Sequence, residues 1–208
     1  MRKFIKILIA AAFAFLVNAP AHAALPAQLE SVILDAQTNH ETDYLKLQNL
    51  EDLSPDNYLK ARVQKPTAAR AMKRLDIHEG VLLEALLKPS LKLVPAQIFP
   101  EHMSESEKAG WQNRVLNALQ VGAAAALTHR QTTHTEAALA FALNNEDYLG
   151  IRAPLCVFYG RTARHAQGVS SLKSIAETAS GRVQQSAIIG LGKTRQLSAL
   201  RALESILA

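Results

Sequence analysis

The chain has 208 residues, of which 23 are Lys or Arg and 18 are Asp or Glu, giving a formal net charge of +5 at pH 7. Residues 1–23 hold three of the basic residues and no acidic one, so the remainder carries 20 basic against 18 acidic residues, about +2. A charge this small, with both signs interspersed, argues against nucleic-acid binding, which needs a concentrated basic face to displace phosphate counterions.

Residues 1–23 have the pattern of a secretory signal peptide. The segment opens with Arg2, Lys3 and Lys6, continues with the apolar run Ile7 to Val17, and ends in Ala21-His22-Ala23. An uncleaved membrane anchor is the alternative, but a run of 11 residues is short against the roughly 20 that a spanning helix needs. We therefore predict cleavage after Ala23 and a periplasmic protein that meets the membrane only during export.

Residues 24–208 are enough for one domain with a substantial core. Cys156 is the only cysteine, so no disulfide can form within the chain. A free thiol in an oxidising compartment is either reactive or buried. Cys156 aligns with the apolar Ile188 in the repeats described below, which favours a buried, structural cysteine.

Apolar residues recur at steps of three and four from Leu25 onward, which indicates helices along nearly the whole chain. Expected helices, in chain order, cover about 26–38, 44–50, 54–62, two stripes within 68–87 separated by Gly80, 104–127 and 137–143. Ser104 followed by Glu107 predicts a capping box. Gly122, followed by four alanines, predicts a helix surface that a neighbour can approach closely.

Residues 88–104 are expected to be extended rather than helical. Pro89, Pro95 and Pro100 remove backbone donors and disfavour helix in the residues before them. A loop of this length is either functional or a connector that lies against the body of the protein. The apolar residues within it favour the packed connector, and both interpretations remain open.

The last sixty residues repeat themselves. Ile151, Leu155, Cys156, Tyr159 and Gly160 recur 32 positions later as Val183, Ala187, Ile188, Leu191 and Gly192; Val169, Leu172 and Ile175 recur 31 positions later as Leu200, Leu203 and Ile206. The clearest repeats are thus 151–177 and 183–207, each a helix, a break marked by glycine and a second helix. One such unit cannot bury its apolar stripe alone, so copies must stack. We predict an all-α fold, an α-solenoid of stacked antiparallel helix pairs with a less regular N-terminal half.

The last unit, VQQSAIIGLGKTRQLSALRALESIL, resembles the HEAT-like repeats of the type grouped with phycobilin lyase repeats. It has the alanine-rich first helix, the Leu-Gly at its end, the short basic turn and the leucine-rich second helix. The unit at 151–177 departs from this pattern, with Tyr159 in place of leucine and a turn about one residue longer. The resemblance implies a protein-binding scaffold, or, as in a minority of such proteins, one that acts on tetrapyrroles.

Two surfaces are candidates for binding a partner. Second helices of solenoid repeats commonly line the concave side, and there the repeats pair Ser170, Lys173 and Ser174 with Arg201, Glu204 and Ser205 in a polar stripe. The stripe is either a contact surface or ordinary solvated surface. Phe99 and Trp111, with the nearby Ile98, form the second candidate.

We expect no catalytic residue, no cofactor and no metal site. The chain lacks HExxH, CxxC and GxSxG patterns, and the phosphate-loop likeness of Gly192-Lys193-Thr194 fails because Ala187 stands where the first glycine is needed. His40-Glu41 and His78-Glu79 are sequence neighbours that point to different helix faces, so we expect them to be exposed. A metal site assembled from distant residues stays open.

The function predicted from the sequence is that of an exported protein-binding scaffold or adaptor, not an enzyme. The first alternative is a tetrapyrrole-handling or other cofactor-handling protein of the lyase kind. The second is a structural or inhibitory protein that caps another exported protein. The identity of the partner and the oligomeric state do not follow from the residues.

Overall fold

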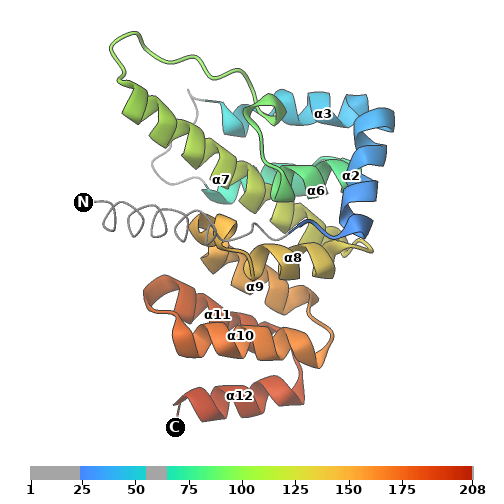
Figure 1. Cartoon of the computed structure of the whole chain (residues 1–208), viewed down its shortest axis with the longest axis vertical. Helices are drawn as coiled ribbons and strands as arrows, with labels where there is room; N and C mark the ends of the chain where they lie inside the picture. The colour runs from blue at the N-terminus through green and yellow to red at the C-terminus, as the bar shows by residue number, and fades with distance from the viewer. Residues whose placement is uncertain (1–23, 55–64, 208) are drawn as a thin grey trace, which may run out of the picture.

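A computed structural model describes residues 24–54 and 65–207 (Figure 1). Within these ranges the fold has ten α-helices, three short 3-10 segments and no strand, which confirms the all-α prediction. The α-helices are α2 (Ala27–Asn39), α3 (Glu41–Gln48), α5 (Lys65–Arg74), α6 (Glu79–Leu87), α7 (Glu105–Arg130), α8 (Thr135–Leu143), α9 (Arg152–Thr162), α10 (Ala166–Thr178), α11 (Gly181–Lys193) and α12 (Leu197–Leu207). The 3-10 segments are η1 (Glu51–Leu53), η2 (Leu91–Leu93) and η3 (Glu146–Ile151).

The N-terminal helices form where the apolar spacing predicts them. In α2, Leu29, Ile33 and Ala36 lie on one buried stripe, and α2 packs against α6. Helix α5 packs against α7, which in turn contacts α6. The expected signal peptide and most of the expected helix at 54–62 lie outside the described residues.

Gly80 lies inside α6 rather than between two helices, so its predicted role as a break is wrong. The break falls before it, at residues 75–78. Gly80 instead permits a close contact, because a Cβ added there would stand 2.6 Å from Ala36 Cβ on α2 and collide with the carbonyl oxygen of Val32. The first turn of α6 therefore rests on the backbone of α2.

Helix α7 starts with the predicted capping box. Glu107 N donates to Ser104 Oγ at 3.3 Å, and Ser104 N donates to the Glu107 carboxylate at 2.9 Å. The hydrogen bonds from Ser104 hold the pKa of Glu107 below its usual value. Gly122 has the expected role as well, because a Cβ there would collide with Met72 Sδ of α5.

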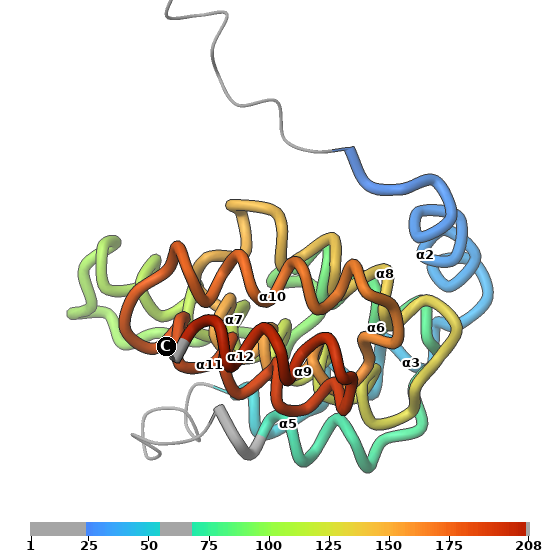
Figure 2. The backbone as a smooth tube through the Cα atoms, turned by 90° about the horizontal axis from the view of Figure 1, so that it is seen from below, coloured from blue at the N-terminus to red at the C-terminus, as the bar shows by residue number. Residues whose placement is uncertain are grey.

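The last four helices occupy both predicted repeats, and Figures 1 and 2 show them at one end of the molecule's long axis. Helix α9 packs against α11, and α10 packs against α11 and α12. Cys156, Leu172, Ala187 and Leu191 are fully buried, whereas Ile188 is half-buried. The predicted burial of Cys156 is confirmed.

The two repeat glycines do not mark the breaks. Helices α9 and α11 run past Gly160 and Gly192 to Thr162 and Lys193. Gly160 lies against Gly190, where an added Cβ would stand 2.6 Å from the Gly190 Cα. Gly192 is exposed with nothing near it. The helix contact therefore uses a glycine pair that the repeat alignment does not match.

Helix α12 is the outermost described helix, and its apolar residues are less covered than their counterparts. Leu200 is 53% exposed, whereas Val169, its equivalent in α10, is 5% exposed. A terminal repeat has a neighbour on one side only, which accounts for the difference.

Residues 88–104 divide into a packed and an exposed half. Leu93 and Val94 are buried beside η2, but Ile98 is 82% exposed. The first half of the segment is therefore a connector that packs against the body of the protein. The second half is exposed and can contact a partner. No described helix is long and apolar enough to cross a membrane.

Candidate functional site

A basic hollow of about 720 Å³ lies where the C-terminal ends of α5, α7, α9 and α11 meet. This size falls within the range of about 300–1,000 Å³ that is usual for ligand sites. The hollow is lined by Lys73, Ala125, Thr128, His129, Gln131, Arg161, Ala163, Arg164, Lys193, Thr194, Arg195 and Gln196. The lining therefore holds five Lys or Arg side chains and one histidine, and no Asp or Glu.

The basic side chains are there because each of the four helices carries one in its last turn. These are Lys73 in α5, His129 in α7, Arg161 in α9 and Lys193 in α11. Lys and Arg at these positions interact favourably with the negative end of each helix dipole. Packing of α5 against α7, of α7 against α9 and of α9 against α11 then gathers the four ends into one place.

Two residues on the rim have backbone conformations that are uncommon for side chains of their size. Gln131, with φ of 53°, and Arg195, with φ of 57°, are the two non-glycine residues of positive φ in the described part of the chain. Both line the hollow. Gln131 is the C-cap of α7, and a left-handed residue is a common ending for a helix.

Hydrogen bonds join the turns that surround the hollow. Arg164 Nη2 donates to Gln131 Oε1 at 2.9 Å, which ties the α9–α10 turn to the end of α7. Gln196 Nε2 donates to the Ala163 carbonyl at 3.1 Å, which ties the α11–α12 turn to the α9–α10 turn. These contacts fix the spacing of the basic groups.

The positive charge of the hollow is not cancelled by ion pairing. Lys73, Arg161, Arg164, Lys193 and Arg195 form no salt bridge with any carboxylate in residues 24–54 or 65–207. Glu136 approaches, but it accepts from the backbone N of Arg164, at 3.2 Å. Clustered cations around a concavity raise the local concentration of anionic ligands.

Sequence reasoning missed the hollow, although the repeats contain a signal for it. Residues 161–164 and 193–195 form the basic turns of successive units, and stacking the units places those turns together. The contributions of Lys73 and His129 could not be read in this way, because they come from helices outside the clear repeats.

Phe99 and Trp111, one of the two predicted partner sites, do come together. They line a pocket of about 360 Å³ with Ile98, Pro100, His102, Met103 and Glu107. The guanidinium of Arg114 lies over the Trp111 ring, 4.6 Å from its centroid. The pocket is formed by the exposed half of the 88–104 segment and the start of α7.

The other predicted partner site, the polar stripe, lies at the other end of the molecule, on α10 and α12 (Figure 1). Ser170, Arg201 and Glu204 are exposed, and Lys173 is half-buried with its Nζ 3.5 Å from Glu177. The helices α10 and α12 that carry these residues are in contact.

The thiol of Cys156 is fully buried. Burial raises the pKa of its thiol to about 11. At neutral pH the sulfur therefore stays protonated, and the thiolate is the form that reacts.

Comparison of the chain with protein-family models, with curated proteins and with solved structures gives no match.

Proposed function

We propose that the protein is an exported HEAT-like scaffold, built as an α-solenoid of stacked helix pairs, that binds an acidic segment of a partner protein in the basic hollow. The stacking of α9 on α11 and of α10 on α12 supports the solenoid, because equivalent helices of the two units meet. The signal-like residues 1–23 support export to the periplasm.

The basic hollow is the observation that carries the proposal. Five Lys or Arg side chains, from three helix ends and the two turns that follow α9 and α11, surround one concavity, while residues 24–208 as a whole carry only about +2. Such a local excess of one sign complements a partner of the opposite sign and speeds their encounter. Carboxylates of an acidic peptide segment offer that charge.

The lining favours a peptide over a tetrapyrrole, the alternative that the family resemblance implies. A large conjugated ring needs apolar and aromatic side chains around it. Ala125 and Ala163 are the apolar residues of the lining, and neither can cover a ring. The polar Thr128, Thr194 and Gln196 instead suit the amides and carboxylates of a peptide.

The test measures binding of a fluorescein-labelled oligoglutamate peptide by fluorescence anisotropy. We expect binding that weakens as salt is added, because exposed charges are screened. The double variant Arg161→Glu with Lys193→Glu should lower the affinity by more than about tenfold, since it places like charges opposite the peptide. The matched control is Lys173→Glu with Arg201→Glu, which makes the same charge change on α10 and α12 and should bind as the unaltered protein does.

Three results would contradict the proposal. One is equal peptide binding by the Arg161/Lys193 variant and the unaltered protein. Another is loss of binding in the control alone, which would assign the interface to the polar stripe on α10 and α12. The third is tighter binding of a single-stranded oligonucleotide of equal charge, or of a tetrapyrrole followed by its absorbance.

A further inference from the structure

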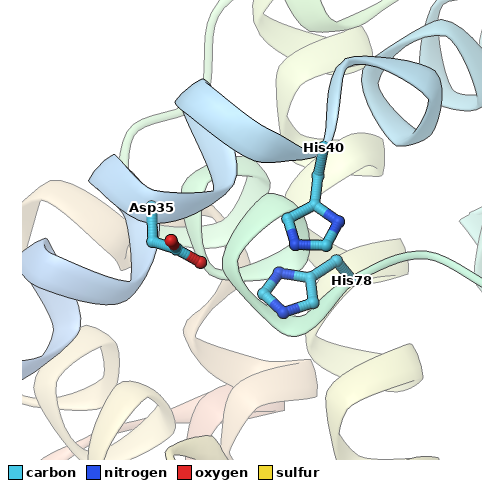
Figure 3. A group of neighbouring side chains, drawn as sticks. All are labelled: Asp35, His40 and His78. Carbon is cyan, nitrogen blue, oxygen red and sulfur yellow. The ribbon is translucent and has the colours of Figure 1, made fainter.

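Three metal-binding side chains meet beside the α2–α3 junction. Asp35 lies near the end of α2, His40 between α2 and α3, and His78 directly before α6. One ligand atom from each lies within 4.8 Å of the others, and Figure 3 shows the Asp35 carboxylate facing the two rings. We propose that Asp35, His40 and His78 bind a divalent transition-metal ion, with Zn²⁺ as the ion that suits them best.

The packing of α6 on α2 creates this cluster. Gly80 lets the first turn of α6 rest against Ala36, one residue after Asp35. That contact places His78, at the N-cap of α6, beside His40, with the ring centroids 3.7 Å apart and the planes 4° from parallel. Both histidines are half-buried, so the sequence-based expectation that they are exposed is wrong.

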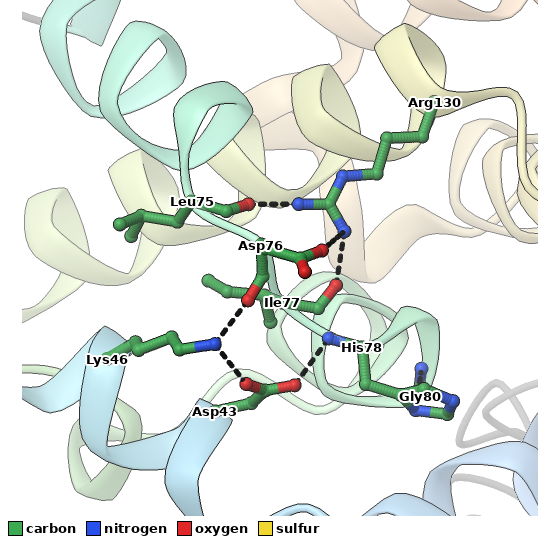
Figure 4. Close-up of polar contacts among 8 residues, drawn as sticks. All are labelled: Asp43, Lys46, Leu75, Asp76, Ile77, His78, Gly80 and Arg130. Carbon is green, nitrogen blue, oxygen red and sulfur yellow. Dashed lines mark hydrogen bonds and ion pairs between the residues drawn. The ribbon is translucent and has the colours of Figure 1, made fainter.

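A polar network holds the His78 backbone in place (Figure 4). His78 N donates to Asp43 Oδ2 at 2.6 Å, and Lys46 Nζ donates to Asp43 Oδ1 at 2.6 Å. On the other side, the Arg130 guanidinium donates to the carbonyls of Leu75 and Ile77. The segment that carries His78 is therefore anchored from α3 and from α7.

Asp43 joins the two sides of this contact, because one carboxylate oxygen accepts from the His78 amide and the other accepts from Lys46 of α3. The position of the His78 backbone relative to α3 is thereby fixed.

The donor set identifies the class of ion. Two imidazole nitrogens and one carboxylate oxygen suit Zn²⁺ and its neighbours in the first transition row, whereas Ca²⁺ and Mg²⁺ take oxygen ligands. Three protein ligands leave a fourth position for water. Zn²⁺ has no geometric preference from its d electrons, so it tolerates the adjustment that these side chains must make.

The donor atoms do not yet stand at metal-binding distances, so the three side chains must rearrange to bind Zn²⁺. Ligand atoms around tetrahedral Zn²⁺ stand about 3.3–3.6 Å apart, so the donor atoms must close in from as much as 4.8 Å. The stacked rings must also turn, because their lone pairs lie in nearly parallel planes. Asp35 keeps one oxygen on Asn39 Nδ2 at 2.8 Å and has the other available.

His78 already uses one ring nitrogen within the chain. Its Nδ1 accepts from Gly80 N at 3.2 Å, a long hydrogen bond that caps α6. A neutral imidazole has one lone-pair nitrogen, so while Nδ1 accepts from Gly80 N, Nε2 carries the proton and cannot bind a metal. Zn²⁺ binding by His78 therefore breaks this hydrogen bond, and the test must separate loss of a ligand from loss of the cap. His78→Ser does so, because serine is a good N-cap acceptor but lacks the imidazole.

The experiment is isothermal titration of the metal-free protein with ZnCl₂, with folding checked by circular dichroism. We expect one Zn²⁺ per chain, and the d–d absorption of a tetrahedral site when Co²⁺ replaces Zn²⁺. Asp35→Asn, His40→Ala and His78→Ser should each weaken Zn²⁺ binding by at least about tenfold, because loss even of a supporting residue costs that much. The matched control, His165→Ala, removes an exposed histidine elsewhere and should bind as before.

The proposal fails if the folded protein takes up no Zn²⁺. It fails equally if Zn²⁺ binding survives His40→Ala, whose side chain makes no capping hydrogen bond and whose loss leaves the helix ends intact. Binding of Mg²⁺ or Ca²⁺ with the same affinity as Zn²⁺ would show a nonspecific anionic surface instead.

Discussion

Residues of one type have different roles in the terminal helices, and the glycines show this best. Gly160 and Gly190 meet backbone to backbone between α9 and α11, whereas Gly192 meets nothing. The repeat alignment equates Gly160 with Gly192 and predicts that both mark a break, but the two glycines have different surroundings and neither ends its helix.

Substituting these glycines with alanine should have opposite effects on stability. Gly160→Ala should lower the free energy of unfolding by about 1–3 kcal/mol, because backbone atoms of Gly190 cannot move aside for a methyl group. Gly192→Ala should raise it by about 0.5–1 kcal/mol, since alanine is the better helix former. Urea unfolding of the two variants checks both signs, and a stabilised Gly160→Ala protein would contradict the contact.

Ionisation of the buried Cys156 should make the protein less stable in alkali. The folded thiol has a pKa of about 11 against an ordinary value of 9.0, so between these values the unfolded chain binds fewer protons than the folded one. The free energy of unfolding is then unaffected below pH 9.0 and falls as pH rises through this window, by up to about 1.4 kcal/mol per pH unit.

Urea unfolding across this pH range, for the unaltered protein and for Cys156→Ala, measures the effect. The free energy of unfolding of the variant should fall less steeply with pH. The comparison uses the slope of this free energy against pH, not its absolute value. Burial also raises the pKa of Tyr159, and that of Tyr148 to about 12, but these groups act alike in both proteins. Identical slopes would mean that the Cys156 thiol is accessible to solvent.

At the scale of elements, the apolar spacing of the sequence predicts where the helices lie, but it does not predict which helices contact each other. The capping box at Ser104, the long α7 and the four terminal helices all lie where the residues predict them. Periodicity defines which face of a helix is apolar, but it does not say which neighbour covers that face. Gly80 illustrates this limit, because a glycine in the sequence can indicate either a break between two helices or a close contact between them.

Ala187→Asp should unfold the terminal helices, because Ala187 is fully buried on α11, the helix that packs against α9. An unpaired buried charge costs about 3–5 kcal/mol. Gln185→Asp, at an exposed position of the same helix, is the matched control and should change stability little. A thermal melting curve that Ala187→Asp leaves unchanged would place Ala187 outside the interface.

At the scale of the whole molecule, the two candidate sites show what sequence reasoning misses. In the sequence His40 and His78 each stand beside a glutamate, yet in the fold the two histidine rings stack on each other. Lys73 and Lys193 likewise line one hollow although they are 120 positions apart in the sequence. Contacts between distant segments depend on how helices pack, and apolar spacing contains little information about that.

The basic hollow exists only once the helices have packed together, and this decides when the protein can bind an acidic partner. Three helix ends and two turns supply its Lys and Arg residues, so an unfolded chain has the same basic residues but no concentrated field. An acidic partner that recognises the hollow would ignore the unfolded chain and bind only the folded protein. Binding to the hollow would thus occur only after the helices have packed together.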